Sequence, residues 1–438
     1  MKPITLTALF IAIHSCLGGL TNADKTNVVF FHPDGTGMAG WVANRMVEYG
    51  PDEMSHWDRL DRVALYRGHQ RDSLNTSSHA GATAHAYGKR VPTDSFGMFR
   101  DQTLVALSGF EGSLLQEAKS KGVFVGIVNS GHIAEPGTAV YAASSESRSD
   151  TDSIAKQVIE SDFDVILSGG ETMLLPQGVV GFHGEAGIRE DDLNVIELAK
   201  SRGYKVIYTK EALLAIDPEK DQKVLGVFAA EHTFHDETEE YLKEHALPLY
   251  DPESPTIAEM LDVTLKIAKA SKKQFCIVAE EEATDNFAND NNATGWLEAY
   301  RRSDLAIGAV INFIEDNPNT FLVTAADSEA GGPEVLSPSR EHENYFQPGN
   351  AIPSTTENGS PIDGVWGTNG IPFVSKPDQF GEIHTFVIAW SAFSDMAGGV
   401  IARAHGKHSE LLENHIENTG VYRLMYEVLF GKRLSPES

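Results

Sequence analysis

Three apolar segments, each with the length and composition of a buried strand, are followed directly by acidic residues. In open α/β sheets, catalytic and ligand-binding groups gather at the carboxyl ends of the strands. Several carboxylates that meet at one such edge would suit a hard or borderline cation. The segments are 28–31, 275–278 and 321–323, and the acidic residues that follow them are Asp34, Glu280, Asp285 and Asp327.

Ser78 begins a stretch of small residues, 78–84, that has the pattern of a helix N-terminus. The free N–H groups and the dipole at such an end favour an anion such as phosphate or sulfate, and small residues let the backbone approach it closely. The same pattern also fits an ordinary serine at the start of a packing helix. Ser78 is therefore a candidate for anion chemistry, with a structural role as the alternative.

Strand and helix patterns alternate along most of the chain, and several strand patterns are nearly continuous apolar runs. Such runs are typical of strands buried on both faces of a parallel sheet. The alternation predicts an α/β fold, a doubly wound and mostly parallel sheet sandwiched by helices. Strands are predicted near 26–33, 62–67, 123–129, 163–168, 275–280, 319–325, 385–390 and 399–404, and helices near 113–119, 150–160, 255–270, 294–315 and 419–429.

One segment, 333–383, is rich in Pro, Ser, Asn and Gly and fits neither period. Loops of this length are usually functional or disordered, so we predict a loop or subdomain inserted at the edge of the site. The remainder of 24–438 has no long low-complexity linker and is predicted to form a single domain. The segment 231–236 is interpreted as a solvated loop, with a polar rim or a metal contact as the alternative.

The first 23 residues have the pattern of a secretory signal, with an apolar stretch over 6–13 and small or polar residues up to Ala23. We expect cleavage after Ala23 and a periplasmic or secreted protein. The apolar stretch is too short to span a bilayer, and no other segment approaches the length of a transmembrane helix. Lipid attachment at Cys16 is the alternative. Cleavage would leave Cys276 as the single cysteine, without an intrachain disulfide.

The chain of 438 residues carries a formal net charge of −28, and 41% of its residues are hydrophobic. This composition is that of a globular protein large enough for one large α/β domain. The negative field repels phosphate backbones and anionic lipid surfaces at long range. Nucleic acid and anionic membranes are therefore not expected as partners.

Taken together, four motifs of this chain resemble the alkaline phosphatase family in order and approximate spacing. Supporting stretches at 154–170, 255–260 and 399–431 extend the resemblance over nearly the whole mature chain. The resemblance implies hydrolysis of phosphate monoesters through a covalent phosphoserine, with two metal ions about 4 Å apart and a third nearby. The four motifs are 34–37, 78–84, the pair Glu280 and Asp285, and 324–327.

The resemblance also implies a role for each matching residue. Ser78 would be the nucleophile. Among the metal ligands, Asp34 would bridge the second and third ions, Asp327 would bind the second, Asp285 the first and Glu280 the third.

Two further site positions follow from the same resemblance. Glu135 stands where the family has a Thr or Asp ligand of the third ion, and a carboxylate there suits magnesium. Arg148 matches the guanidinium that binds the phosphoryl oxygens as a bidentate fork, if two residues are inserted before it; a surface arginine is the alternative. Ser77 and His79 flank the nucleophile where an aspartate and a small residue are usual.

The chain departs from the family pattern at three imidazole ligands. Asn289 and Ser328 stand where two of these histidines are expected, and the window 393–397, where the third is expected, contains no histidine. Asn289 and Ser328 remain candidate ligands through their neutral side-chain oxygens. His384 is predicted to replace the third histidine through an insertion, with a structural histidine as the alternative.

Neutral oxygen ligands suit harder ions than zinc, for which imidazole is a good ligand. Magnesium is therefore the expected ion, manganese and calcium are alternatives, and zinc stays open. The expected function is an exported, metal-dependent hydrolase of small phosphate esters, and because family members are often dimeric the resemblance allows a homodimer. The alternatives are a phosphodiesterase or sulfatase-like esterase that uses the same serine, and a non-catalytic descendant that binds phosphate or metal.

Overall fold

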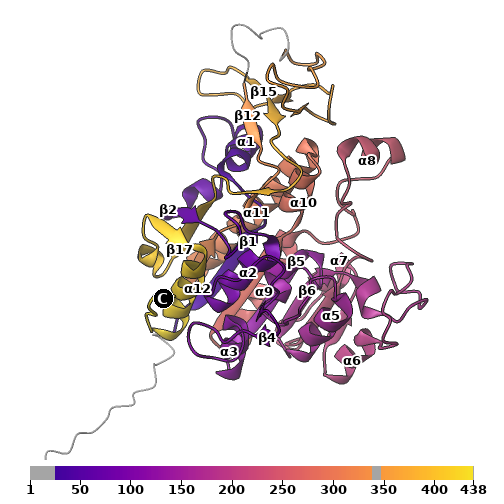
Figure 1. Cartoon of the computed structure of the whole chain (residues 1–438), viewed down its shortest axis with the longest axis vertical. Coiled ribbons are helices and arrows are strands. Elements are labelled where there is room, and N and C mark those ends of the chain that lie inside the picture. The colour runs from indigo at the N-terminus through magenta and orange to yellow at the C-terminus, as the bar shows by residue number, and fades with distance from the viewer. Residues whose placement is uncertain (1–24, 338–346, 438) are drawn as a thin grey trace, which may run out of the picture.

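The computed structural model describes residues 25–337 and 347–437 (Figure 1). The predicted signal sequence and Cys16 lie outside the described residues. No helix in the described ranges is long and apolar enough to cross a membrane.

A ten-stranded sheet forms the centre of the molecule. The seven strands from β10 to β7 are parallel to one another, and β17 is antiparallel to both of its neighbours, β10 and β2. The order across the sheet is β18 (His415–Glu417), β2 (Arg62–Arg67), β17 (Ile401–Gly406), β10 (Thr320–Thr324), β1 (Asn27–Pro33), β9 (Phe275–Glu281), β5 (Phe124–His132), β6 (Val165–Gly169), β8 (Val224–Val227) and β7 (Lys205–Ile207).

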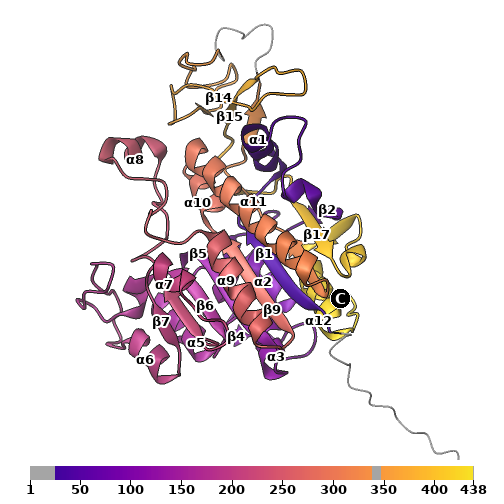
Figure 2. The ribbon, with the colours of Figure 1, turned by 180° about the vertical axis from the view of Figure 1, so that it is seen from behind.

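Side chains of β1 alternate between two separate hydrophobic cores. Val28 and Phe30 belong to the core that contains residues of α2, α3, α5 and α12, whereas Val29 and Phe31 belong to the core that contains residues of α9 and α11. Figures 1 and 2 show these two helix layers on opposite faces of the sheet. Both faces of a central strand are therefore covered by apolar cores, which explains the continuous apolar run 28–31 and confirms the doubly wound fold. The helices are α2 (Ser78–Tyr87), α3 (Leu114–Ser120), α5 (Thr151–Glu160), α9 (Ile257–Ala270), α11 (Ala293–Asp316) and α12 (Asn418–Phe430).

A smaller unit lies beyond one end of the large sheet, at the top of Figure 1. Here β15 (Thr385–Ala389) pairs antiparallel with β12 (Glu334–Leu336), β13 (Ile362–Asp363) and β14 (Phe373–Val374). The strand predicted at 385–390 therefore forms, but it belongs to this small sheet. The described part of 333–383 thus pairs with the strand that follows it.

Strand register brings the carboxyl ends of the central strands together. His32 of β1 and Asn129 of β5 both lie opposite Glu280 of β9. Beyond these ends follow short elements that carry further polar residues: α4 (Pro136–Ala139), α10 (Ala283–Asn289), and the two-residue strands β11 (Glu329–Ala330) and β16 (Asp395–Met396), which pair antiparallel.

Candidate metal centre

The predicted carboxylates meet at the carboxyl ends of β1, β9 and β10, and all are buried. Two groups of side chains there have ligand atoms within 4.8 Å of one another: His32, Asp34 and Asp327, and separately Asp34, Glu280 and Glu282. Asp34 belongs to both groups, so it joins the two sets of candidate ligands.

His32 is an imidazole in this cluster that sequence reasoning missed. Its Nδ1 lies 2.7 Å from the carbonyl oxygen of Ala325, its Nε2 3.1 Å from Asp34 Oδ1 and 3.8 Å from Glu280 Oε1. A carbonyl only accepts hydrogen bonds, so Nδ1 carries a proton. The other ring nitrogen, Nε2, faces the carboxylates, and a metal ion bound there would take the place of a proton on Nε2. The sequence signal was a histidine two residues before Asp34, inside an otherwise apolar strand.

Asp285 and Asn289 form a second group with Asp395. They lie one turn apart on α10, and the Asn289 amide donates to Asp285 Oδ2 at 2.9 Å and to Asp395 Oδ1 at 3.0 Å. The pairing of β11 with β16 brings Asp395 to this position, opposite Ala330. Asp395 lies in the window where a histidine was sought. Sequence reasoning looked there only for imidazole, although a carboxylate is an equally good ligand for a hard ion.

Buried polar atoms without a hydrogen-bond partner among the described residues are concentrated in this cluster. Such atoms are costly in a protein interior because they lose their contacts with water. A bound cation would satisfy carboxylate oxygens and an imidazole nitrogen alike, so the donor set fits divalent metal ions. The atoms are His32 Nε2, Asp34 Oδ2, Glu280 Oε1, Glu282 Oε2, Asp285 Oδ1, both Asp327 carboxylate oxygens and Ser328 Oγ.

Protonation within the cluster reflects the crowding of negative charge. Burial, and then the neighbouring carboxylates, raise the pKa of Glu280, Glu282, Asp285 and Asp327 well above the usual range. Burial also opposes ionisation of Asp34, but the adjacent His32 outweighs it and lowers the Asp34 pKa. Without cations, these carboxyls therefore hold protons that a metal ion would displace.

Ser78 is the first residue of α2, and its helix end packs directly on the carboxylates. Gly81, in the first turn of α2, lies so close to Asp327 that a Cβ there would overlap the aspartate side chain. The Thr76 hydroxyl donates to the Asp327 carbonyl oxygen at 2.6 Å. Ser78 itself is 8% exposed. The neighbouring Ser77 instead contacts Gln70, whose side-chain oxygen accepts from the Ser77 amide at 3.1 Å.

Gly137, on α4, repeats this close packing at a second carboxylate. Its hydrogen faces Glu280, and a Cβ in its place would overlap the Glu280 carboxylate. Glycines on two short elements therefore allow backbone to enclose two of the predicted ligands.

Arg148 lies beside the same cluster with its side chain 48% exposed, and one guanidinium nitrogen is 3.8 Å from Glu135 Oε2. Burial and then the Arg148 charge lower the pKa of His79, which is next to Ser78 in the chain. The Arg148 charge also opposes the rise in the pKa of Asp395. The guanidinium charge thus acts on His79, on Asp395 and on Glu135, where it could contact an anionic group.

Glu135 is buried near the cluster, but its Oε1 faces two imidazoles. His132 Nε2 is 2.9 Å away and His232 Nδ1 is 3.8 Å away. Burial alone would raise the pKa of Glu135, but His132, together with His232 and Arg148, lowers it to about 2. Burial, and then His132, lower the pKa of His232 to about 4.

The structure does not bring His384 to the other predicted ligands. His384 is half exposed in the small unit, where its Nε2 lies 3.1 Å from Asp378. The His384 backbone N–H donates to the Ser375 hydroxyl oxygen at 2.9 Å. The residue that occupies the expected place beside Asp285 and Asn289 is Asp395, not His384.

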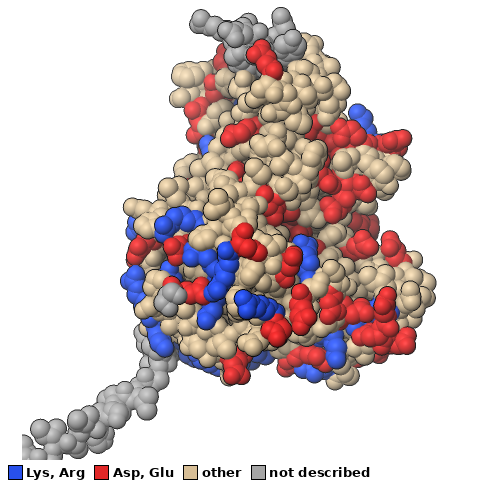
Figure 3. Space-filling model, in the orientation of Figure 1, with Lys and Arg blue, Asp and Glu red and all other residues tan. Residues whose placement is uncertain are grey.

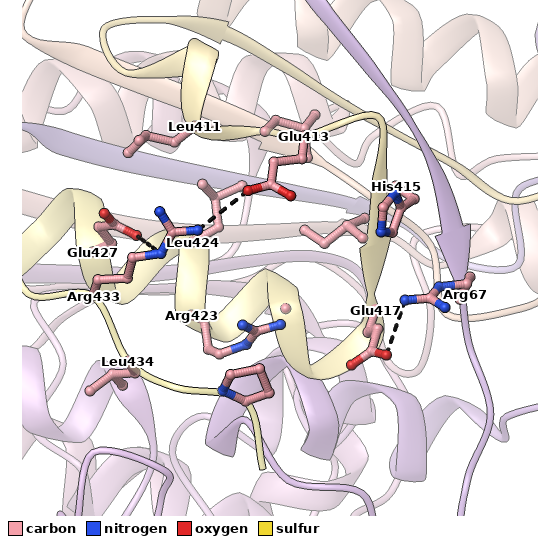
Figure 4. A pocket seen from close by; sticks show the side chains of 14 residues that line it. Arg67, Leu411, Glu413, His415, Glu417, Arg423, Leu424, Glu427, Arg433 and Leu434 are labelled. Atoms are coloured by element: carbon pink, nitrogen blue, oxygen red, sulfur yellow. Dashed lines mark hydrogen bonds and ion pairs between the residues drawn. The ribbon is translucent and has the colours of Figure 1, made fainter. Parts of the chain in front are cut away.

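Elsewhere on the surface, a cavity of about 280 Å³ lies between β18 and α12 (Figure 4). Two of its arginines are ion-paired: Arg67 with Glu417, and Arg433 with Glu413 and Glu427. None of the predicted site residues line this cavity. In Figure 3, basic side chains gather over β2 and α2, whereas acidic side chains spread around α8 (Glu239–His245).

The comparison with known families agrees with this geometry. Residues 25–353 match the family model described as alkaline phosphatase. The chain belongs to the alkaline phosphatase family. The matched range includes Asp34, Ser78, Glu280, Asp285 and Asp327.

Curated relatives carry the same family name. Alkaline phosphatase 4 of Bacillus subtilis is 26% identical over 322 residues, which cover 71% of this chain and 62% of the relative. The tissue-nonspecific alkaline phosphatase of Rattus norvegicus is 25% identical over 345 residues, which cover 70% of this chain and 64% of the relative. The chain therefore spans less than two thirds of either relative's length.

Solved structures show the same fold. The alkaline phosphatase of the Antarctic bacterium TAB5 superposes with a TM-score of 0.70 and 17% identity, over 93% of this chain and 99% of that one. The alkaline phosphatase of Thermus thermophilus superposes with a TM-score of 0.72 and 19% identity, over 98% of this chain and 97% of that one. At these identities the match shows that the alkaline-phosphatase-like α/β architecture is retained.

Proposed function

We propose that this protein is an exported, metal-dependent hydrolase of small phosphate monoesters that acts through a phosphoserine at Ser78. The observation that carries the proposal is the contact between the N-terminal turn of α2 and Asp327. Ser78 begins this helix, and Gly81 in the same turn packs on the Asp327 side chain, whose carboxylate oxygens have no hydrogen-bond partner among the described residues. This arrangement joins a nucleophile, an anion-binding helix end and cation ligands in one place.

The chain's own residues supply binding, orientation and the nucleophile. The N–H groups at the start of α2 and the Arg148 guanidinium would hold the phosphoryl oxygens. The Ser78 hydroxyl oxygen would then attack phosphorus while the ester oxygen leaves as the alcohol, and water would later release phosphate from the serine. Divalent ions, when bound, would lower the pKa of a bound hydroxyl and stabilise negative charge on oxygen.

Three ligand groups would hold these ions. The first consists of Asp285, Asn289 and Asp395; the second of His32, Asp34, Asp327 and Ser328; the third of Asp34, Glu280 and Glu282. Oxygen dominates all three groups, which favours magnesium, manganese or calcium, and His32 offers the single imidazole.

Export and assembly complete the proposal. Cleavage after Ala23 would release a mature protein into the periplasm or the medium. The single cysteine of the described residues, Cys276, is buried and free. Assembly as a homodimer is proposed from the family resemblance alone.

The test measures turnover of a generic phosphomonoester by the mature protein, before and after chelation, with magnesium, manganese, calcium and zinc restored separately. Activity should return with a hard cation. Ser78→Ala should lower it by at least about 10³-fold, because the nucleophile is lost. Ser77→Ala is the matched control, since this neighbouring serine contacts Gln70, and it should retain most of the activity.

Acid quenching during turnover, followed by peptide mapping, should find phosphate on Ser78. Absence of turnover with every metal, or full activity of Ser78→Ala, would refute the proposal. Phosphate binding without turnover would instead identify a non-catalytic binding protein.

A further inference from the structure

His132, Glu135 and His232 form a cluster of two imidazoles around one carboxylate. His132 ends β5, Glu135 immediately precedes α4, and His232 lies in the loop after β8. Their candidate ligand atoms lie within 4.8 Å of one another, and the imidazole rings stack with centroids 4.9 Å apart. Two segments of the chain, the turn between β5 and α4 and the loop after β8, therefore meet at Glu135.

The ring nitrogens of His132 have assigned roles in this arrangement. The Ala134 backbone N–H donates to His132 Nδ1 at 3.2 Å, so the proton of the neutral ring resides on Nε2. That nitrogen faces Glu135 Oε1 at 2.9 Å. A metal ion that replaced this proton would be bound through Nε2, while the backbone N–H kept the ring in its orientation.

Two atoms of the cluster are buried and have no hydrogen-bond partner among the described residues: Glu135 Oε2 and His232 Nδ1. The Glu135 side chain is only 3% exposed. The Arg148 guanidinium lies 3.8 Å from Glu135 Oε2, and His232 Nδ1 lies 3.8 Å from Glu135 Oε1. Both contacts are longer than a hydrogen bond, and burial of polar atoms without hydrogen bonds is unfavourable. A cation between them would satisfy both.

The cluster borders the oxygen-rich centre, because burial and then neighbouring charges that include Glu135 raise the pKa of Glu280 and of Glu282, but it is a different set of ligands. Asp34, Glu280 and Glu282 form a three-carboxylate group without any contribution from Glu135. The two sets also differ in chemistry: carboxylates alone suit hard ions, whereas two imidazoles and one carboxylate suit borderline ions such as zinc and cobalt.

The cluster also borders a solvent-accessible space. His232 lines a cavity of about 680 Å³, together with residues of the segment 229–237 and with His183. His132 and His232 keep side-chain exposures of 16% and 14%. An ion could therefore reach the cluster from this cavity, and water could occupy a fourth coordination position.

We propose that His132, Glu135 and His232 bind one transition-metal ion of the zinc type, separate from the hard cations at the carboxylate centre. The proposal does not depend on Ser78 chemistry. It removes Glu135 from the third-ion ligand set that the family resemblance implied.

The first experiment titrates metal-depleted mature protein with Co²⁺ in excess Mg²⁺, which fills the oxygen-rich groups. Cobalt in a site with two imidazoles gives visible ligand-field bands. Calorimetry then gives the number of Co²⁺ ions bound per chain. His132→Gln and His232→Gln should each lose these bands and one tightly bound ion, or bind it at least about tenfold more weakly.

His235→Gln is the matched control, because His235 lies in the same loop and lines the same cavity. It should bind Co²⁺ as the unmodified chain does. Equal Co²⁺ binding by all three variants would refute the site. Equal loss of Co²⁺ binding in all three would also refute it, because the loop as a whole, and not the cluster, would then control binding.

A second measurement uses the unmodified chain and needs no variant to fold. Acylation of histidines, mapped by mass spectrometry, should be suppressed by zinc at His132 and His232 but not at His235. Equal acylation with and without zinc at both cluster histidines would overturn the proposal.

Discussion

At the scale of single residues, the site exchanges imidazole for oxygen while it keeps its carboxylates. Asn289, Ser328 and Asp395 stand where the family resemblance implies histidine. The Asn289 amide nitrogen bridges the two acidic residues of its group, while the Asn289 oxygen accepts from the Gly331 N–H at 3.1 Å. His32 adds one imidazole from inside β1. The substitutions should therefore change which metal ion the site prefers, while the carboxylates that form a cation site are kept.

Restoring the imidazoles should change the preferred ion. The triple variant Asn289→His, Ser328→His, Asp395→His is expected to bind zinc about 10- to 100-fold more tightly than the unmodified chain, or more. Replacing residues that only contact metal ligands already changes affinity by this factor, and replacing the ligands themselves should change it at least as much. Competition with a chromogenic chelator measures the affinity. An unchanged ratio of zinc to magnesium affinity would show that these positions do not contact metal.

His32 should influence both the metal and Asp34. His32→Gln removes the imidazole that lowers the Asp34 pKa, so Asp34 should titrate at higher pH. The same variant should bind zinc about tenfold more weakly than the unmodified chain. His85→Gln is the control, because His85 is buried beside His32 but its Nε2 lies 2.7 Å from the Tyr66 hydroxyl. Equal zinc affinity in both variants would exclude His32 as a ligand.

Sequence reasoning located the acidic residues correctly in relation to their strands, because a strand end followed by a carboxylate is a local pattern. The structure brings Asp34, Glu280 and Asp327 together at one sheet edge, as expected. It does not bring His384 there, since that expectation required the length of an insertion to be inferred. Asp395 could be found only from the pairing of β11 with β16, which joins segments that are distant in sequence.

At the scale of elements, the position of α2 depends on the absence of a side chain at Gly81. The helix end contacts Asp327 closely enough that no Cβ fits between them. The long strands and helices were predictable because their apolar periods are regular. The assignment of 385–389 to the small sheet was not predictable from the sequence. Strand partners are set by long-range contacts, and the local apolar pattern carries no information about them.

Gly81→Ala should displace the helix end from Asp327. The added methyl group is expected to cost about 1–3 kcal/mol in unfolding free energy and to lower turnover by about 10²-fold through misplacement of Ser78. Denaturant unfolding and steady-state kinetics measure the two effects. Gly399→Ala is the control, because a Cβ at Gly399 meets no atom within 4 Å; equal behaviour of both variants would contradict the argument.

At the scale of the whole molecule, stability and metal content should be linked through the buried carboxyls. The pKa values of Glu280, Glu282, Asp285 and Asp327 are raised in the metal-free fold. A raised folded-state pKa favours folding below the pKa of the unfolded chain, about 4 for these groups, and this contribution is lost as pH rises through the folded-state value. Metal-free protein should therefore weaken as pH rises.

Chelation should consequently lower the melting temperature more at pH 9 than at pH 6. Each restored ion should return about 4 kcal/mol at a thousandfold excess over its dissociation constant, and its binding should release protons. Calorimetry in buffers of different ionisation enthalpy measures that release. A melting temperature that responds equally to chelation at both pH values would contradict the link.

The glycines that touch the carboxylates have a consequence for laboratory evolution of this protein. Gly81 and Gly137 pack against Asp327 and Glu280 so closely that any larger residue meets a ligand. Positions 289, 328 and 395 already carry a Cβ, so a substitution there changes the donor atom and not the backbone spacing that the glycines allow. A combinatorial library intended to produce new metal specificities should therefore vary these three positions and keep both glycines constant.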